Sequence, residues 1–115
     1  ALGNTRTAFI TNDKKLKKKL LKASKDSLNK VWPLPLDNYY RKIVKGTISD
    51  YKNHTPKVMA GTIMAAAFLE KFVEQTPWIH LDIAGSAFVE RKVEHKPHGA
   101  TGEPLKLLFE FLKAY

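Results

Sequence analysis

The 115-residue sequence contains no cysteine. This absence excludes catalysis by a thiolate, zinc sites with cysteine ligands and a disulfide framework. Long apolar runs are also missing, because stretches such as 65–69 are far shorter than the roughly 18 residues that a membrane-spanning helix requires. Residues 1–11 lack the basic, apolar and small-residue regions of a secretory signal. We therefore expect no membrane association and find no support for secretion.

Motifs that carry a catalytic nucleophile or a phosphate-binding loop are missing too. There is no Gly-x-Ser-x-Gly elbow, and Ser86, which follows Gly85, has no evident base partner in the sequence. The stretch 99–102 lacks the Gly-Lys-Ser/Thr ending of a P-loop. The residues by themselves therefore predict no complete active site.

The acidic residues are scattered, whereas a two-metal hydrolytic site needs several carboxylates close together. Asp82 stands two positions after His80, and this spacing favours a hydrogen-bonded structural pair over a metal site. Glu94, His95 and His98 could form a ligand cluster by their spacing, but their polar surroundings favour a solvated loop. We predict no metal ligands in this chain.

Net charge is +9, and the excess is concentrated near the N-terminus. Residues 1–30 hold nine basic and two acidic side chains, whereas the remainder holds eleven and nine. A lysine run of this kind attracts phosphate backbones or anionic lipid without sequence selectivity. Leu16, Leu20 and Leu21 supply an inward stripe at helical spacing, so we favour a solvated helix face for the lysines.

The composition is that of a globular protein, with 43% hydrophobic and 27% charged residues. A chain of this length fits one domain or a piece of one, and about two-thirds of its unfolded surface could be buried. The sequence opens with Ala1-Leu2-Gly3 instead of methionine, without a helix start signal. We expect that it begins inside a larger protein.

Apolar periodicity, prolines and glycines predict alternating strands and helices. Two prolines confine 32–36 to an extended or edge segment, because proline cannot donate to a sheet ladder. Small residues let the buried helix 59–73 approach a neighbour closely. The expected elements are a strand at 8–11, a helix capped by Asn12-Asp13 and ending near Ser27, an extended segment at 32–36, a short helix at 37–44, a long loop at 46–57, a largely buried helix at 59–73, a core strand at 78–85, a turn at 99–102, and a helix after Pro104 with an apolar stripe of Leu105, Leu108, Phe109 and Leu112. This order favours an α/β fold, part of a mixed β-sheet sandwiched between helices.

Residues 78–85 read Trp-Ile-His-Leu-Asp-Ile-Ala-Gly. This stretch resembles a motif near the C-terminus of the leucine aminopeptidase (leucyl or cytosol aminopeptidase) family. Other segments resemble the family in the same order, so that the likeness spans almost all 115 residues. They are residues 1–3, 9–12, 32–36, 49–53, 60–63, 66–69 and 99–102.

The resemblance implies that residues 1–115 form the C-terminal section of the catalytic domain of a dinuclear metallo-exopeptidase. Such an enzyme releases N-terminal amino acids, leucine among others, from peptides, and the family implies a homohexamer in the cytoplasm. Its two divalent ions, zinc or manganese, are held by motifs that lie upstream of the point matching Ala1. The sequence contains neither motif. We therefore expect no catalytic residues here and an inactive isolated section.

Substrate-pocket positions do carry over from the resemblance. Ala84 and Ala87 match positions in the family's pocket wall, where small side chains would leave room for a substrate side chain. His54 falls at a pocket-rim position. The alternative is a stand-alone basic α/β binding module that contacts nucleic acid or acidic membrane through the helix at 14–25; on the enzyme interpretation, nucleic acid is not a partner.

Overall fold

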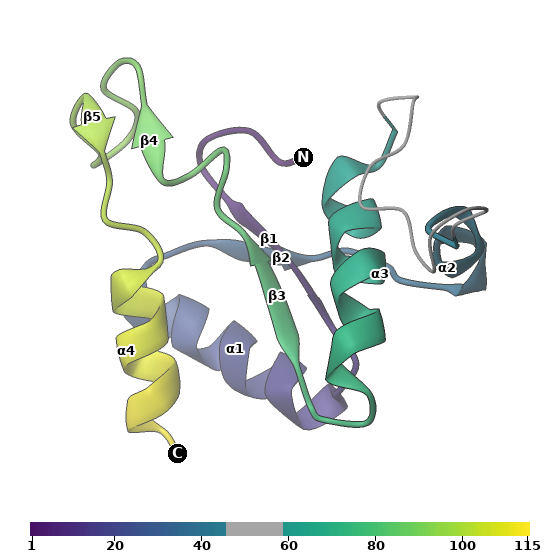
Figure 1. The fold of residues 1–115 in the computed structure, drawn as a ribbon. Coiled ribbons are helices and arrows are strands. Elements are labelled where there is room, and N and C mark those ends of the chain that lie inside the picture. Colours follow the sequence, from purple (N-terminus) through teal and green to yellow (C-terminus); the bar gives the residue numbers. More distant parts are fainter. Residues whose placement is uncertain (46–58) are drawn as a thin grey trace.

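The computed structural model describes residues 1–45 and 59–115. The expected loop at 46–57, including His54, lies outside the described residues. Strands and helices alternate over the first four elements, and a further helix, three strands and a final helix follow (Figure 1). They are β1 (Thr7–Thr11), α1 (Lys14–Ser27), β2 (Val31–Pro33), α2 (Asn38–Ile43), α3 (Gly61–Val73), β3 (Ile79–Asp82), β4 (Phe88–Val89), β5 (Gly99–Ala100) and α4 (Leu105–Lys113).

In the described part of the chain, the main sheet has three strands in the order β2-β1-β3. Strand β1 pairs with β2 in parallel and with β3 in antiparallel orientation, with Phe9 opposite Pro33 on one side and Leu81 on the other. The outer position of β2 agrees with the prediction from its prolines. A second sheet consists of the short antiparallel strands β4 and β5.

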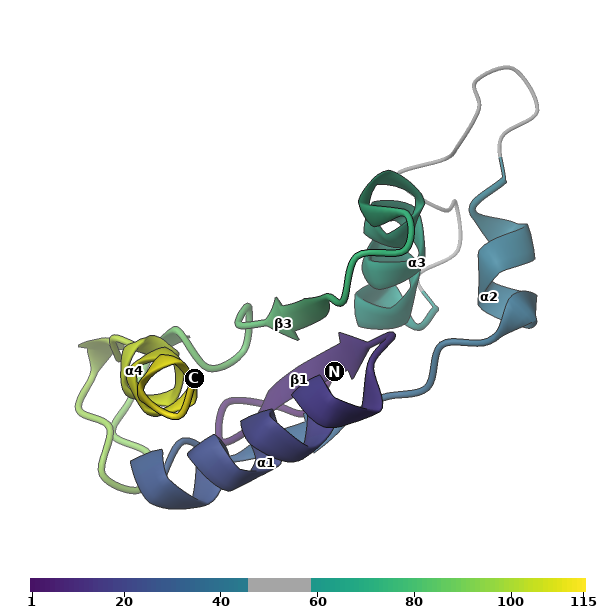
Figure 2. The same ribbon diagram turned by 90° about the horizontal axis from the view of Figure 1, so that it is seen from below.

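Helices cover both faces of the main sheet (Figure 2). Successive side chains of β1 point to opposite faces, so Phe9 packs in a cluster with Leu20 of α1 and Leu107 of α4, while Ile10 packs against Ile63 of α3. Helix α2 lies beyond α3 and contributes Tyr40 to the second cluster. The predicted mixed sheet between helices is confirmed.

Local signals define helix α1. The Asp13 side chain accepts a hydrogen bond of 2.7 Å from the Leu16 backbone N–H, which satisfies one of the free donors at the helix start. Leu28 ends the helix in the left-handed region, with φ of 62°. Leu20 is fully buried, and Leu21 packs against the same cluster. The inward stripe is confirmed, and the cap falls on Asp13, the second residue of the predicted Asn12-Asp13 pair, so that no carboxylate lies in the first turn.

Helix α4 forms as predicted, but its apolar stripe does not face the core. Leu107 is fully buried and Phe111 packs beside it, whereas the stripe predicted from periodicity is exposed. The exposed side chains are Leu105, Leu108, Phe109 and Leu112. Asn29 contributes to this orientation, because its side-chain oxygen accepts a hydrogen bond of 3.2 Å from the Leu107 N–H.

Three further expectations need correction. Helix α3 is buried on one face only, since Leu69 and Phe72 are exposed. The strand expected at 78–85 ends at Asp82, because the chain turns there, and it lies at the outside of the described sheet. The turn expected at 99–102 begins with strand β5, which pairs with β4.

Candidate functional site

The chain turns sharply after β3, and this turn carries both predicted pocket alanines. The Ile83 carbonyl accepts hydrogen bonds from the N–H groups of Ser86, at 3.1 Å, and Ala87, at 2.9 Å. Ala84 is exposed in the turn and Ala87 is half-buried. The structure therefore brings Ala84 and Ala87 together within residues 83–87, which we call the β3 turn.

Asp82 ties the β3 turn to helix α3. Its carboxylate accepts hydrogen bonds from the Thr62 hydroxyl, in the first turn of α3, and from the Ala84 N–H at 3.0 Å. Partial burial alone would raise the pKa of Asp82, but these hydrogen bonds, together with the nearby positive charges of the N-terminal amine and His80, hold the pKa below its ordinary value. Asp82 is therefore an ionised anchor for the turn.

The partners of Asp82 differ from the expected pair with His80. Burial lowers the pKa of His80, and the negative charge of Asp82 opposes this effect. The His80 ring lies 6.1 Å from the Trp78 ring, measured between centroids. The aspartate thus has the predicted structural role, but Thr62 and Ala84 are its hydrogen-bond partners.

Gly85 allows the β3 turn to approach the N-terminal segment. A Cβ atom at this position would collide with the backbone carbonyl oxygen of Gly3. Any larger residue would force either the turn or the segment to move. This close approach gives a physical reason for the glycine that follows Ala84.

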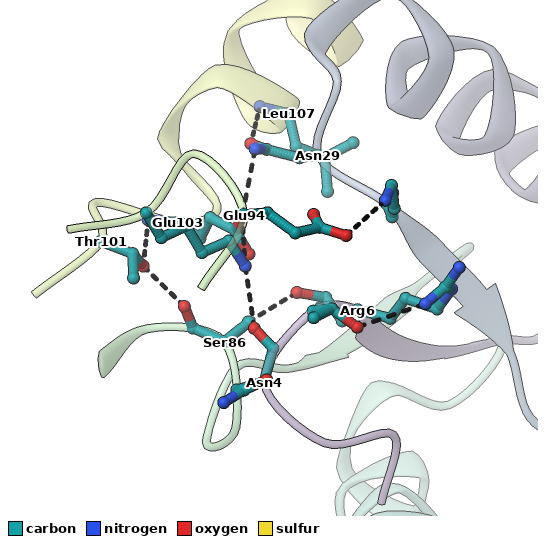
Figure 3. Close-up of polar contacts among 12 residues, drawn as sticks. Asn4, Arg6, Asn29, Ser86, Glu94, Thr101, Glu103 and Leu107 are labelled. Atoms are coloured by element: carbon teal, nitrogen blue, oxygen red, sulfur yellow. Dashed lines mark hydrogen bonds and ion pairs between the residues drawn. The ribbon is translucent and has the colours of Figure 1, made fainter. Parts of the chain in front are cut away.

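Hydroxyl groups hold the β3 turn from two sides. The Ser86 hydroxyl is fully buried and lies 2.7 Å from the Thr7 hydroxyl at the start of β1. On the other side, Thr101 donates from its hydroxyl to the Ser86 carbonyl at 2.6 Å and from its N–H to the Ala87 carbonyl at 2.8 Å (Figure 3). Ser86 is thus a structural hydroxyl, which agrees with the absence of a nucleophile motif.

A buried ion pair supports the same region. Lys96 Nζ lies 2.9 Å from Glu103 Oε1, and the two side chains are only 4% and 7% exposed. Lys96 also donates to the Asn4 carbonyl at 3.0 Å, and Asn29 donates to Glu103 at 3.3 Å. Figure 3 shows this network beside the residues that hold the β3 turn. Sequence reasoning missed it, because a lysine in a polar stretch normally indicates a solvated loop.

The other candidate ligands stay apart from this network. Glu94 is exposed and pairs with Lys30 at 2.9 Å, and hydrogen bonding to this lysine lowers the pKa of Glu94. His95 is exposed, and His98 lies edge-on to Phe88. Within residues 1–45 and 59–115, no three histidine or acidic side chains form a group that could hold a metal ion. Glu94, His95 and His98 are therefore solvent-exposed as predicted, but the prediction of a solvated loop is wrong for Lys96, which is buried between them.

The lysine run lies on the outer face of α1. Six of its seven members are exposed, and the seventh, Lys19, lies 3.7 Å from the centre of the Tyr115 ring. Lys22 pairs with Asp26 one helical turn later, at 3.0 Å. The lysines thus lie on an exposed helix face, and the preference for a purely solvated role stays a prediction. The exposed members are Lys14, Lys15, Lys17, Lys18, Lys22 and Lys25.

None of the described helices is both long and apolar enough to cross a bilayer.

We expect this face to bind polyanions weakly and with strong salt dependence. Exposed lysines attract phosphates by charge, and salt screens this attraction. Contacts to phosphates do not distinguish one base sequence from another. Fluorescence anisotropy with two unrelated DNA duplexes should give similar, weak affinities that fall steeply with added salt. Lys17→Gln/Lys18→Gln should weaken the binding, whereas Lys113→Gln on α4 serves as the control. Sequence-selective binding that persists at high salt would instead support the binding-module alternative.

Comparisons with known proteins agree on one family. The catalytic-domain profile of the cytosol aminopeptidase family matches residues 1–109. A protein named "Probable cytosol aminopeptidase" from Clostridium tetani is 41% identical over all of this chain, and one from Clostridium perfringens is 43% identical over 96% of it. These alignments cover 24% and 22% of the two relatives.

A solved structure shows the same fold. The bottromycin maturation enzyme BotP in complex with Mn is 34% identical in sequence and superposes with a TM-score of 0.91, over 99% of this chain and 25% of that protein. The chain therefore spans about a quarter of the proteins that it resembles.

Proposed function

The chain belongs to the cytosol aminopeptidase family, and from this membership we propose that residues 1–115 are the C-terminal section of the catalytic domain of a metal-dependent aminopeptidase. The complete enzyme releases N-terminal amino acids, leucine among them, from peptides. The match of the catalytic-domain profile to almost the whole chain is the observation that carries this proposal.

In this proposal, the section supplies part of the wall of the substrate pocket. Ala84 and Ala87 lie in one turn at the end of a sheet strand, and binding residues are commonly found on loops that a rigid scaffold positions. Their small side chains leave volume for the side chain of the substrate's N-terminal residue. His54 is proposed as a rim residue from the resemblance alone.

Exposed apolar side chains support the view that this section packs against further parts of a larger domain. Exposed apolar patches commonly mark interfaces. Trp32 is 61% exposed on the outer strand β2, and Phe72 is 65% exposed on α3. On α4, Leu105, Phe109 and Leu112 are each more than 60% exposed.

The described residues do not fit a two-metal centre, because they provide no cluster of histidine or acidic side chains. We propose that two divalent ions, zinc or manganese, are bound by parts of the enzyme outside this section. The role of residues 1–115 is therefore to shape the pocket and to hold its wall in place. The homohexamer and the cytoplasmic location remain proposals from family membership, and sedimentation of the complete protein would test the first.

The activity can be tested by comparing the complete protein with residues 1–115 alone. We expect the complete protein to hydrolyse leucine amide in the presence of Mn²⁺ or Zn²⁺ and to lose turnover when a chelator is added. The section alone should show no turnover with either metal, since a metal-activated water needs ligands that it lacks. Metal-dependent turnover by the pure section, or none by the metal-loaded complete protein, would contradict the proposal.

A further inference from the structure

Thr101 makes two hydrogen bonds to consecutive carbonyl groups of the β3 turn. Its hydroxyl donates to the Ser86 carbonyl at 2.6 Å, and its backbone N–H donates to the Ala87 carbonyl at 2.8 Å. Ala87 is one of the two proposed wall residues, so Thr101 holds the backbone directly next to the Ala87 side chain. Thr101 itself lies 14 positions farther along the sequence and is half-buried.

The backbone around Thr101 is also fixed. Strand β5, which ends at Ala100, pairs with β4, so that Phe88 lies opposite Ala100 and Val89 opposite Gly99. Gly99 and Gly102 have φ angles of 111° and 76°, in the region that favours glycine. The Thr101 hydroxyl additionally accepts a hydrogen bond of 3.2 Å from the Glu103 N–H, which orients the side chain.

The buried ion pair between Lys96 and Glu103 fixes the segment that directly follows this threonine. Glu103 is two positions beyond Thr101, and its carboxylate is held by Lys96 and Asn29. The segment that follows β5 is therefore attached both to the connection between α1 and β2, through Asn29, and to the residues before β1, through Lys96 and Asn4. A hydrogen-bond donor on such a support can restrict the movement of the turn that it contacts.

The geometry assigns Thr101 as a positioning residue that sets the substrate specificity of the pocket by holding the Ser86 and Ala87 carbonyls. This inference rests on the proposed function, in which Ala87 lines the pocket wall. Loss of the hydroxyl donor should let the β3 turn move and weaken its contact with a large substrate side chain. An alanyl side chain is too short to depend on that contact.

The test uses Thr101→Val in the complete protein, which removes the hydroxyl with little change in side-chain volume. We expect the leucyl-to-alanyl ratio of kcat/KM to fall about three- to tenfold, mainly through KM for the leucyl substrate. The kcat for the alanyl substrate and the metal content should remain unchanged. Thr101→Ser, which keeps the donor, should retain the wild-type ratio. Thr76→Val provides a matched control, because Thr76 is exposed and lies outside the β3 turn.

Other outcomes would overturn the inference. An unchanged ratio in folded, metal-loaded Thr101→Val would show that the hydroxyl does not set specificity. An equal loss for both substrates would indicate a general structural role. If Thr101→Val does not fold, Thr101→Cys, with a weaker donor, should give an intermediate ratio, and a wild-type ratio in that variant would also overturn it. Failure of the proposed function is distinguishable, because wild-type protein would then lack metal-dependent aminopeptidase activity.

Discussion

Replacing Ala87 with phenylalanine in the complete enzyme is expected to lower kcat/KM for leucyl substrates by roughly tenfold or more relative to alanyl substrates. Ala87 is half-buried in the β3 turn, at the proposed pocket wall. A phenyl ring would occupy the volume that a leucyl side chain requires, while an alanyl side chain would still fit. The measurement is the ratio of the two kcat/KM values, which removes any common loss of active enzyme.

Ala114→Phe is the matched control for this substitution. Ala114 is exposed at the end of α4, outside the β3 turn, so the same added ring should leave the ratio at its wild-type value. Metal content and circular dichroism establish that each variant is loaded and folded. A folded, metal-loaded Ala87→Phe enzyme with an unaltered leucyl-to-alanyl ratio would show that Ala87 does not line the pocket.

Replacing Lys96 with methionine is expected to destabilise the region around strand β5 by about 3–5 kcal/mol. The Glu103 carboxylate is almost fully buried, and Lys96 is its ion-pair partner at 2.9 Å. Methionine would fill much of the space of the lysine stem but would leave this negative charge without a cation. Hydrogen exchange of the amides between Gly99 and Leu107 in the complete protein measures the local loss of stability.

Two further variants separate the charge effect from simple loss of a side chain. In Lys96→Met/Glu103→Gln, the buried negative charge is removed together with its cation, so most of the lost protection against hydrogen exchange should return. Lys22→Met breaks the exposed pair with Asp26 and should change protection only slightly. The prediction would be wrong if Lys96→Met lowered protection no more than Lys22→Met.

Local sequence signals predicted most elements of this fold because their causes lie within a few residues. The Asp13 cap and the leucines of α1 operate within one or two helical turns, and the prolines of 32–36 exclude an inner strand position through their missing donors. The alternation around Ile79 and Leu81 predicted β3, although the strand ends at Asp82. The family resemblance was also present in the sequence itself, in motifs distributed from end to end.

The orientation of α4 could not be obtained from periodicity. Six of its nine residues are apolar and form one wide face, so the spacing of Leu105, Leu108, Phe109 and Leu112 defined a stripe without identifying which part of that face meets the core. Packing against α1 and β1, together with the hydrogen bond from Leu107 to Asn29, selects the edge that carries Leu107 and Phe111. Burial of a helix face depends on its neighbours, which the sequence of the helix does not contain.

The sequence by itself determined the α/β class, the family and the small residues at positions 84 and 87, because these follow from local pattern and residue identity. Only the tertiary structure decided how the turn that carries them is held. Ser86 meets Thr7 across 79 positions, and Lys96 meets Glu103 in a buried network that a polar, charged stretch does not indicate. Buried polar groups need hydrogen-bond or ion-pair partners, and folding alone decides which residues become those partners.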